Sequence, residues 1–298
     1  MSNTLGDNDW DLLLRRIKEG KCTPFLGAGT CHGTLPLGGD VAQEWAREKG
    51  YPLEDTYDLA RVAQFLAVTE DPMSPKEKIK ERFQGAALPD FAAADEPHGI
   101  LADLPLPVYM TTNYDDFMVQ ALKSRNKKPR QELCRWNKYV RGEPSVFDAA
   151  AGFEPDPINP VVFHLHGHNG VPESLVLTED DYLDFLVALS KDQALLPARI
   201  QRALTGASLL FMGYRIADWD FRVLFRSVVG YLERSISRAH VSVQLAPVGR
   251  QATDEQKAKA QDYLNRYFGE LKIRVYWGTC REFAAELRRR WEAFSHGK

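Results

Sequence analysis

The sequence contains no apolar run that approaches the roughly 18 residues needed to cross a membrane, and its N-terminal segment lacks the basic start, apolar middle and small-residue cleavage site of a secretion signal. We therefore expect a cytoplasmic protein without a membrane contact. An excess of basic charge is also missing, because 38 Lys and Arg residues are balanced by 41 Asp and Glu residues to a formal net charge of -3. This balance argues against a dedicated nucleic-acid-binding protein.

Cysteine is scarce as well. The four cysteines are far apart and form no C-x-x-C pair; they are Cys22, Cys31, Cys134 and Cys280. This spacing supports neither a structural zinc ribbon nor a disulfide framework, so no metal site and no zinc cofactor are expected.

What the sequence does contain is typical of a globular chain, with 44% hydrophobic and 27% charged residues in 298, and we expect residues 1–298 to form a single domain. Short apolar runs with β-branched or aromatic character predict strands at 22–26, 108–110, 161–163, 208–212, 241–245 and 273–276. Apolar residues at helical spacing predict helices at 10–20, 40–49, 55–68, 76–83, 114–122, 179–189, 218–232, 254–268 and 281–294.

Strands that alternate with helices predict an α/β fold with a Rossmann-like, mostly parallel sheet and helices on both faces. The proline-containing stretch around 55–107 is expected to be a small helical insertion, and 141–160 a long loop. Thr178 followed by three acidic residues is typical of a helix N-cap.

The first motif is Gly27-Ala28-Gly29, which follows the strand at 22–26. A turn without β-carbons lets backbone N–H groups approach a pyrophosphate closely, so this turn is a candidate phosphate cradle. However, the third glycine of the dinucleotide fingerprint is lacking, because position 32 is His and Gly33 comes one place late. An ordinary tight turn after a strand explains the same residues.

The second motif, Thr111 to Asp116, follows the strand at 108–110. Open α/β sheets hold ligands at the carboxyl ends of their strands. Asn113 is placed there to orient a water or a hydroxyl, and Asp115 to bind an amide or a ribose. The alternative is that these residues only cap the helix expected from Tyr114.

The third motif places His164, His166 and His168 at alternate positions on and just past a strand. Since side chains two apart share a face of a strand, a metal site has to be considered, with His98 or Asp115 as further ligands. The alternative is a core role for His164 and a general-base role for His166, which comes immediately before Gly167.

The fourth motif repeats the design, since the strand at 208–212 ends in Gly213 and Tyr214 and is followed by Asp218. The ordered set of G-A-G, T-N-Y-D, H-G and G-Y with a following Asp resembles the sirtuin-like domain family, and looks most like the bacterial branch found in antiphage defence proteins. The resemblance covers roughly residues 20–225.

The resemblance implies an NAD site. In sirtuins the glycine loop binds the NAD pyrophosphate and ribose, which implies this role for Gly27, Ala28, Gly29 and Thr30. By the same resemblance Asn113 positions a water beside the nicotinamide ribose, Asp115 contacts the nicotinamide amide and His166 is the catalytic base. The other motif residues assigned to cofactor binding are Thr112, Gly213, Tyr214 and Asp218.

Two departures from deacylating sirtuins matter. Their zinc module has two C-x-x-C pairs shortly after the H-G, whereas no cysteine lies between Cys134 and Cys280 here, so we do not expect a deacylase. Their Pro-x-Phe-Arg segment is replaced by residues 34–39, which leaves open how the loop closes on the nicotinamide ribose. The defence branch also lacks the zinc module, and its members hydrolyse NAD to ADP-ribose and nicotinamide.

The resemblance therefore implies an NAD glycohydrolase that acts in antiphage defence and is gated by homo-oligomerisation or by a separately encoded partner such as a HerA-type hexameric ATPase. A second hypothesis is a non-catalytic module that senses NAD or ADP-ribose and controls a partner's assembly. Nucleic-acid contact through the basic run 123–130 is not expected, because no aromatic residue is interleaved with it. Aromatic residues at 263–294 predict core packing or, alternatively, an interface.

Overall fold

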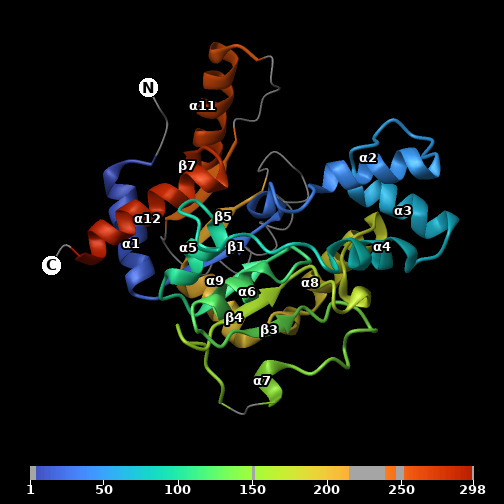
Figure 1. Cartoon of the computed structure of the whole chain (residues 1–298), viewed down its shortest axis with the longest axis horizontal. Coiled ribbons are helices and arrows are strands. Elements are labelled where there is room, and N and C mark those ends of the chain that lie inside the picture. The colour runs from blue at the N-terminus through green and yellow to red at the C-terminus, as the bar shows by residue number, and fades with distance from the viewer. Residues whose placement is uncertain (1–4, 150–151, 215–238, 246–251, 297–298) are drawn as a thin grey trace.

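The structure is a computed structural model that describes residues 5–149, 152–214, 239–245 and 252–296. Within these ranges seven strands form one sheet in the order β3-β4-β2-β1-β5-β6-β7, and every neighbouring pair is parallel (Figure 1). The strands are β1 (Cys22–Leu26), β2 (Val108–Thr111), β3 (Arg130–Leu133), β4 (Val161–His164), β5 (Ser208–Met212), β6 (His240–Gln244) and β7 (Ile273–Trp277). The predicted α/β fold is confirmed.

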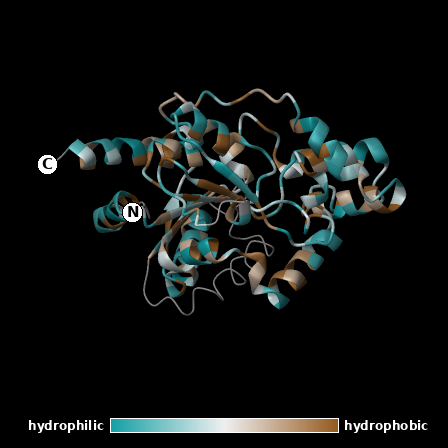
Figure 2. Cartoon of the chain, turned by 90° about the horizontal axis from the view of Figure 1, so that it is seen from below, coloured by the Kyte–Doolittle hydropathy of each residue, from teal (hydrophilic) through white to brown (hydrophobic). Residues whose placement is uncertain are grey.

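Helices cover both faces of the sheet because successive strand residues point to opposite sides. Phe25 faces a core formed with α8 (Glu179–Lys191), α9 (Ala198–Gly206) and α11 (Asp254–Glu270). Leu26 faces the other core, formed with α1 (Asp7–Lys18), α5 (Pro97–Asp103), α6 (Phe117–Ser124) and α12 (Cys280–His296). Figure 2 shows the largely hydrophobic strands at the centre of the molecule, with hydrophilic residues gathered on the surrounding helices.

A small helical lobe stands to one side of the sheet, on the right in Figure 1. It consists of α2 (Gly38–Lys49), α3 (Leu59–Thr69) and α4 (Ser74–Phe83), which bury their apolar faces together with Leu175 and Leu177. Its bounds differ from the expected insertion at 55–107. Trp45 of α2 packs in the lobe, whereas Ile100 of α5 packs on the sheet, because each amphipathic helix has to bury its own apolar stripe.

Several elements were not predicted. β3 has the polar sequence Arg-Gln-Glu-Leu and pairs only with β4 at the edge of the sheet, so it needs no apolar run. The helix α9 was missed, and the short α7 (Val146–Ala149) interrupts the predicted loop 141–160. Three short 3-10 turns complete the described elements: η1 (Ala28–Cys31), η2 (Pro172–Ser174) and η3 (Gln193–Leu195). The helix predicted at 218–232 lies outside the described residues.

The first residues of α8 and α6 are set by polar side chains that accept hydrogen bonds from backbone N–H groups. The predicted N-cap is confirmed, because the Thr178 hydroxyl accepts a hydrogen bond from the Asp181 N–H at 3.1 Å. The helix expected from Tyr114 begins instead at Phe117, whose N–H donates to the Asp115 carboxylate at 2.9 Å. None of the helices that the structure describes is long and apolar enough to span a membrane.

Candidate functional site

The predicted site residues gather at the carboxyl edge of β1, β2, β4 and β5. Because β2 lies on one side of β1 and β5 on the other, the chain leaves β1 at the point where the order of strands reverses. In open parallel sheets the crevice for a ligand forms at this reversal, where neighbouring loops diverge. The loops after β1 and β5 are therefore the natural walls of a binding site.

These two loops touch through their glycines. The Gly29 N–H donates to the Gly213 carbonyl at 3.0 Å, and the Gly27 N–H donates to the Met212 carbonyl at 2.9 Å. A β-carbon on Gly29 would lie 2.8 Å from the Gly213 Cα. Gly213 has φ +82°, and a β-carbon there would lie 2.4 Å from the Gly27 carbonyl oxygen. The close approach of the loops thus explains these glycines by itself.

The same contact decides which amides are left for a ligand. The Thr30 N–H also donates to a protein carbonyl, that of Gly27, at 3.0 Å. The Ala28 N–H is the donor of this turn that has no acceptor among the described residues, and Ala28 is exposed. The turn can therefore offer a phosphate the amide of Ala28, rather than the several amides expected from the motif.

Tyr214 fastens the ends of three strands together. Its ring covers Gly27, where a β-carbon would lie 2.8 Å from the ring. Its hydroxyl donates to the Leu26 carbonyl at 2.7 Å and lies 2.9 Å from the Thr112 hydroxyl. Burial raises the pKa of Tyr214, which keeps the phenol protonated. Thr112 and Tyr214 thus hold the strand ends in place.

Asn113 is buried beside the glycine turn. Its Nδ2 donates to the Gly27 carbonyl at 3.2 Å and also lies 3.3 Å from the Thr30 hydroxyl and 3.2 Å from the Cys31 Sγ. These acceptors fix the orientation of the amide. No hydrogen bond among the described residues uses its Oδ1, so this oxygen can accept one from a water or a hydroxyl.

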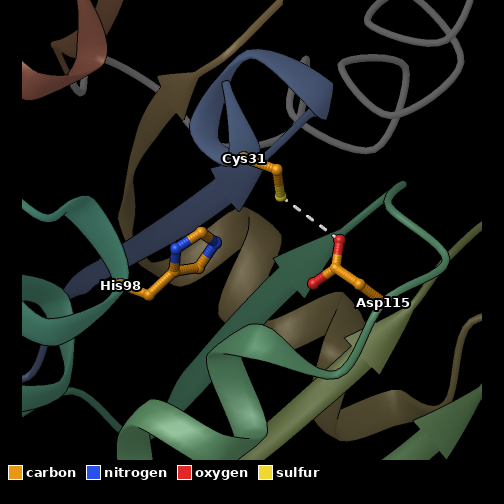
Figure 3. Close-up of side chains that lie close together, drawn as sticks. All are labelled: Cys31, His98 and Asp115. Carbon is orange, nitrogen blue, oxygen red and sulfur yellow. Dashed lines mark hydrogen bonds between the residues drawn. The ribbon is translucent and has the colours of Figure 1, made fainter. Parts of the chain in front are cut away.

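Asp115 fits both roles considered for its motif, that of a helix cap and that of a ligand contact. Its Oδ1 accepts from the Phe117 N–H, as a cap does, while its Oδ2 lies 3.3 Å from the Cys31 Sγ (Figure 3). Figure 3 also shows His98 reaching toward this pair from another segment. The carboxylate is therefore held in place by α6 and points into the site.

The three histidines do not share one face, which corrects the idea of a His-x-His-x-His metal site. β4 ends at His164, and the turn that follows breaks the strand alternation. The rings of His164 and His168 are 4.8 Å apart between centroids. The ring of His166 instead packs against Tyr182 at 5.4 Å and Phe185 at 5.1 Å. The turn needs Gly167, since its φ is +86° and a β-carbon would lie 2.2 Å from the Ser174 carbonyl oxygen.

His166 is buried, and its Nε2 has no hydrogen-bond partner among the described residues. Burial lowers the pKa of His166 to about 3, so the imidazole is neutral at physiological pH. A neutral, unpartnered ring nitrogen in a buried position is costly unless a ligand group meets it. His166 is thus prepared to form a hydrogen bond with a ligand group.

Asn113 and His166 occupy equivalent places on neighbouring strands. Thr111 of β2 pairs in register with His164 of β4, and each of the two candidate residues follows two positions later. Tyr182 of α8 lies against His166, with 5.4 Å between the ring centroids. Sequence reasoning missed Tyr182, which looked like any residue of an amphipathic helix.

The structure thus brings together the glycine turn, Thr112, Asn113, Asp115, Gly213 and Tyr214, and His166 follows the end of the neighbouring strand β4. Asp218 lies outside the described residues. Cys31 was counted only among the cysteines, although it contacts both Asn113 and Asp115.

An all-parallel sheet with glycine turns at the reversal of strand order defines a Rossmann-like α/β protein. The family model of the SIR2-like domain matches residues 107–271, which is more than half of the chain. The chain therefore belongs to the SIR2-like domain family.

Similar curated proteins share one description. The NAD(+) hydrolase ThsA of Acinetobacter baumannii (strain 532279) is 26% identical over 249 residues, which are 78% of this chain and 44% of that protein. The NAD(+) hydrolase ThsA of Enterococcus faecium is 25% identical over 276 residues, 89% of this chain and 52% of that protein. The chain spans about half the length of these curated relatives.

One solved structure, from work on the mechanism and regulation of Sir2 enzymes, is 9% identical. It covers 97% of this chain and 99% of its own, with a TM-score of 0.42. This likeness is too distant to support a conclusion about the site.

Proposed function

We propose that the chain is an NAD glycohydrolase, which cleaves NAD+ to ADP-ribose and nicotinamide. The observation that carries the proposal is the similarity to proteins named NAD(+) hydrolase over 78% and 89% of the chain. The site supports it, because an oriented asparagine and a neutral histidine lie at the ends of neighbouring strands.

The reaction needs little acid catalysis. When the bond between nicotinamide and the ribose breaks, nicotinamide leaves as a neutral molecule and positive charge develops on the sugar. The site has to hold NAD+ and place a water on the exposed face of the ribose. In the proposed arrangement the Asn113 Oδ1 accepts a hydrogen bond from this water, while its Nδ2 stays fixed on the glycine turn.

His166 is the proposed base. A pKa of about 3 makes it a weak base in the free protein. A weak base is sufficient here, because a water that bonds to a cationic sugar carbon becomes strongly acidic as the bond forms. The Nε2 can accept that proton, or hold a ribose hydroxyl, without first losing a proton of its own.

The remaining predicted residues have binding or positioning roles in this proposal. The Ala28 amide meets the pyrophosphate, and Asp115 meets the nicotinamide amide. Gly27, Gly29, Thr30, Thr112, Gly213 and Tyr214 shape the walls of the site rather than contribute charge. Asp218 keeps its proposed role in cofactor binding, and no zinc is needed for the chemistry.

A freely active NAD hydrolase would kill its host, so we also propose that the activity is gated in an antiphage defence system. Homo-oligomerisation or a separate partner, such as a HerA-type ATPase, would supply the gate. The alternative function is an NAD or ADP-ribose sensor without turnover. The unpartnered His166 Nε2 would then bind a ribose hydroxyl and transfer no proton.

The deciding experiment measures nicotinamide release from NAD+ by chromatography, with and without proteins encoded by neighbouring genes. We expect Asn113→Ala and His166→Ala to lower the rate by about 100- to 10,000-fold, the contribution of a positioned acid–base group. The matched controls Asn8→Ala and His32→Ala change exposed residues of the same types and should keep full activity. Full activity in either site variant would refute the assignment, and tight NAD+ binding with no release would favour the sensor.

A further inference from the structure

A buried cluster beside the proposed NAD site contains two residues, Cys31 and His98, that have no role in the mechanism above. Cys31 of η1, His98 of α5 and Asp115 after β2 come from three separate segments and meet in Figure 3. One ligand atom from each lies within 4.8 Å of the other two, and the exposed fractions of the three residues are 4%, 1% and 7%. Cysteine sulfur, histidine nitrogen and aspartate oxygen are the ligand types that zinc prefers.

The distances suit a metal. Zinc bonds of 2.0–2.3 Å in a tetrahedron place neighbouring ligand atoms about 3.3–3.6 Å apart. The Cys31 Sγ and the Asp115 Oδ2 are already 3.3 Å apart. The His98 nitrogen has to approach by no more than about 1.5 Å to complete a three-ligand set, since its distance to each of the other two atoms is at most 4.8 Å.

Each of the three residues also has a neighbouring group within hydrogen-bond distance that can hold it in place, as metal ligands commonly do. The His98 Nδ1 lies 2.8 Å from the Glu96 carboxylate, which leaves the Nε2 of the ring as the free electron pair. The Asp115 Oδ1 accepts the Phe117 N–H at 2.9 Å. The Asn113 Nδ2 lies 3.2 Å from the Cys31 Sγ, where it can donate to a thiolate.

The local charge favours a cation. Two buried carboxylates, Glu96 and Asp115, surround one imidazole, and the Cys31 thiol adds a third group that can become anionic. Among the described residues no Lys or Arg forms an ion pair with either carboxylate. A divalent ion would neutralise this charge in a place where water is excluded.

We propose that Cys31, His98 and Asp115 bind a zinc ion, and that the bound ion inhibits NAD+ cleavage. On binding, the Cys31 S–H bond breaks, a zinc–sulfur bond forms and the proton leaves to the solvent. Zinc then occupies the Asp115 Oδ2, so this carboxylate is no longer free to meet the nicotinamide amide. The inhibitory part rests on the proposed function, whereas the binding part does not.

Binding is tested on the metal-free full chain without NAD+. Zinc affinity is measured by competition with a chromophoric chelator, and cobalt is added as a probe because a thiolate ligand gives it an ultraviolet charge-transfer band. We expect one site and a cobalt–thiolate band in the wild type. Cys31→Ser and His98→Gln should lose about 100-fold or more in affinity, and Glu96→Gln should lose about 10- to 100-fold, as outer residues of metal sites do.

Matched controls are Cys280→Ser, a thiol outside the cluster, and His32→Gln, an exposed histidine next to Cys31. Both should bind zinc as the wild type does. Equal affinity in the wild type, Cys31→Ser and His98→Gln would overturn the site. If His98→Gln fails to fold, as judged by circular dichroism, loss or retention of the cobalt band in the nearly isosteric Cys31→Ser decides.

Inhibition is tested separately by nicotinamide release before and after addition of stoichiometric zinc. We expect zinc to suppress release, and a chelator to restore it, in the wild type and in His32→Gln. Zinc binding without any effect on release would overturn the inhibitory part. Absence of release in the metal-free chain would count against the proposed function, while the zinc affinities would still decide the site.

Discussion

Two buried histidines should make this protein sensitive to mild acid. Burial lowers the pKa of both His164 and His166 from 6.5 to about 3. In the unfolded chain both rings regain an ordinary pKa and bind protons below pH 6.5. Because the unfolded state then binds more protons than the native state, the free energy of unfolding falls as the pH decreases from 6.5 toward 3, and the contribution is fully present above 6.5.

The size of the effect follows from the two pKa values. At pH 5 a ring with pKa 6.5 is almost fully protonated and one with pKa about 3 is neutral, so each histidine removes about 2 kcal/mol of stability relative to pH 8. Two such rings remove about 4 kcal/mol, a large part of the 5–15 kcal/mol typical of a folded domain.

The assay is urea unfolding followed by circular dichroism at several pH values between 8 and 5. His166→Gln should lose about half of the acid-induced drop in stability, since the new side chain does not titrate. His32→Gln, at an exposed position, should show the wild-type drop. If His166→Gln keeps the full pH dependence, His166 titrates normally in the native protein and the description of a buried neutral imidazole is wrong.

Other outcomes follow from the same contacts. Gly213→Ala should lower the free energy of unfolding by at least about 2 kcal/mol more than Gly33→Ala does, as measured by chemical denaturation. Both glycines have positive φ, but only at Gly213 would a β-carbon press against backbone atoms. Tyr214→Phe should cost about 0.5–1.5 kcal/mol in the same assay, since it removes one of the three hydrogen bonds that the Leu26 carbonyl accepts, whereas Tyr139→Phe, 70% exposed, should cost almost nothing. In the proposed hydrolase, the dependence of kcat/KM on pH between 8 and 5.5 should show no ionisation of His166, because its pKa is about 3. A fall in kcat/KM with an apparent pKa near 6.5, absent from His166→Gln, would contradict this pKa.

Much of the sheet could be predicted from the sequence, because buried parallel strands consist of apolar residues on both faces. The run at 161–163 became β4 with one residue added. The edge strand β3 was not predicted, since a strand with one neighbour and exposed residues needs no apolar run. The extent of the helical lobe was not predicted either, because helical periodicity does not tell which core a helix packs on.

The site was predictable only where strand register decides it. Asn113 and His166 come at the same edge of the sheet because both follow paired ends of adjacent parallel strands. The turn that separates His166 from His164 was not foreseen, since alternation ends where the strand ends. Nor was the approach of His98 to Cys31, because 66 residues lie between them and no spacing rule covers such a distance.

The close contact between the Tyr214 ring and Gly27 affects how this protein can evolve. A ring that rests 2.8 Å from the place of a β-carbon forbids every side chain at position 27 for as long as the aromatic residue remains. Mutational drift at either position is therefore conditional on the other, although 186 residues separate them in the sequence. Across descendants of this chain, the two positions are expected to vary as a linked pair, with residues larger than glycine at 27 only where position 214 has lost its ring.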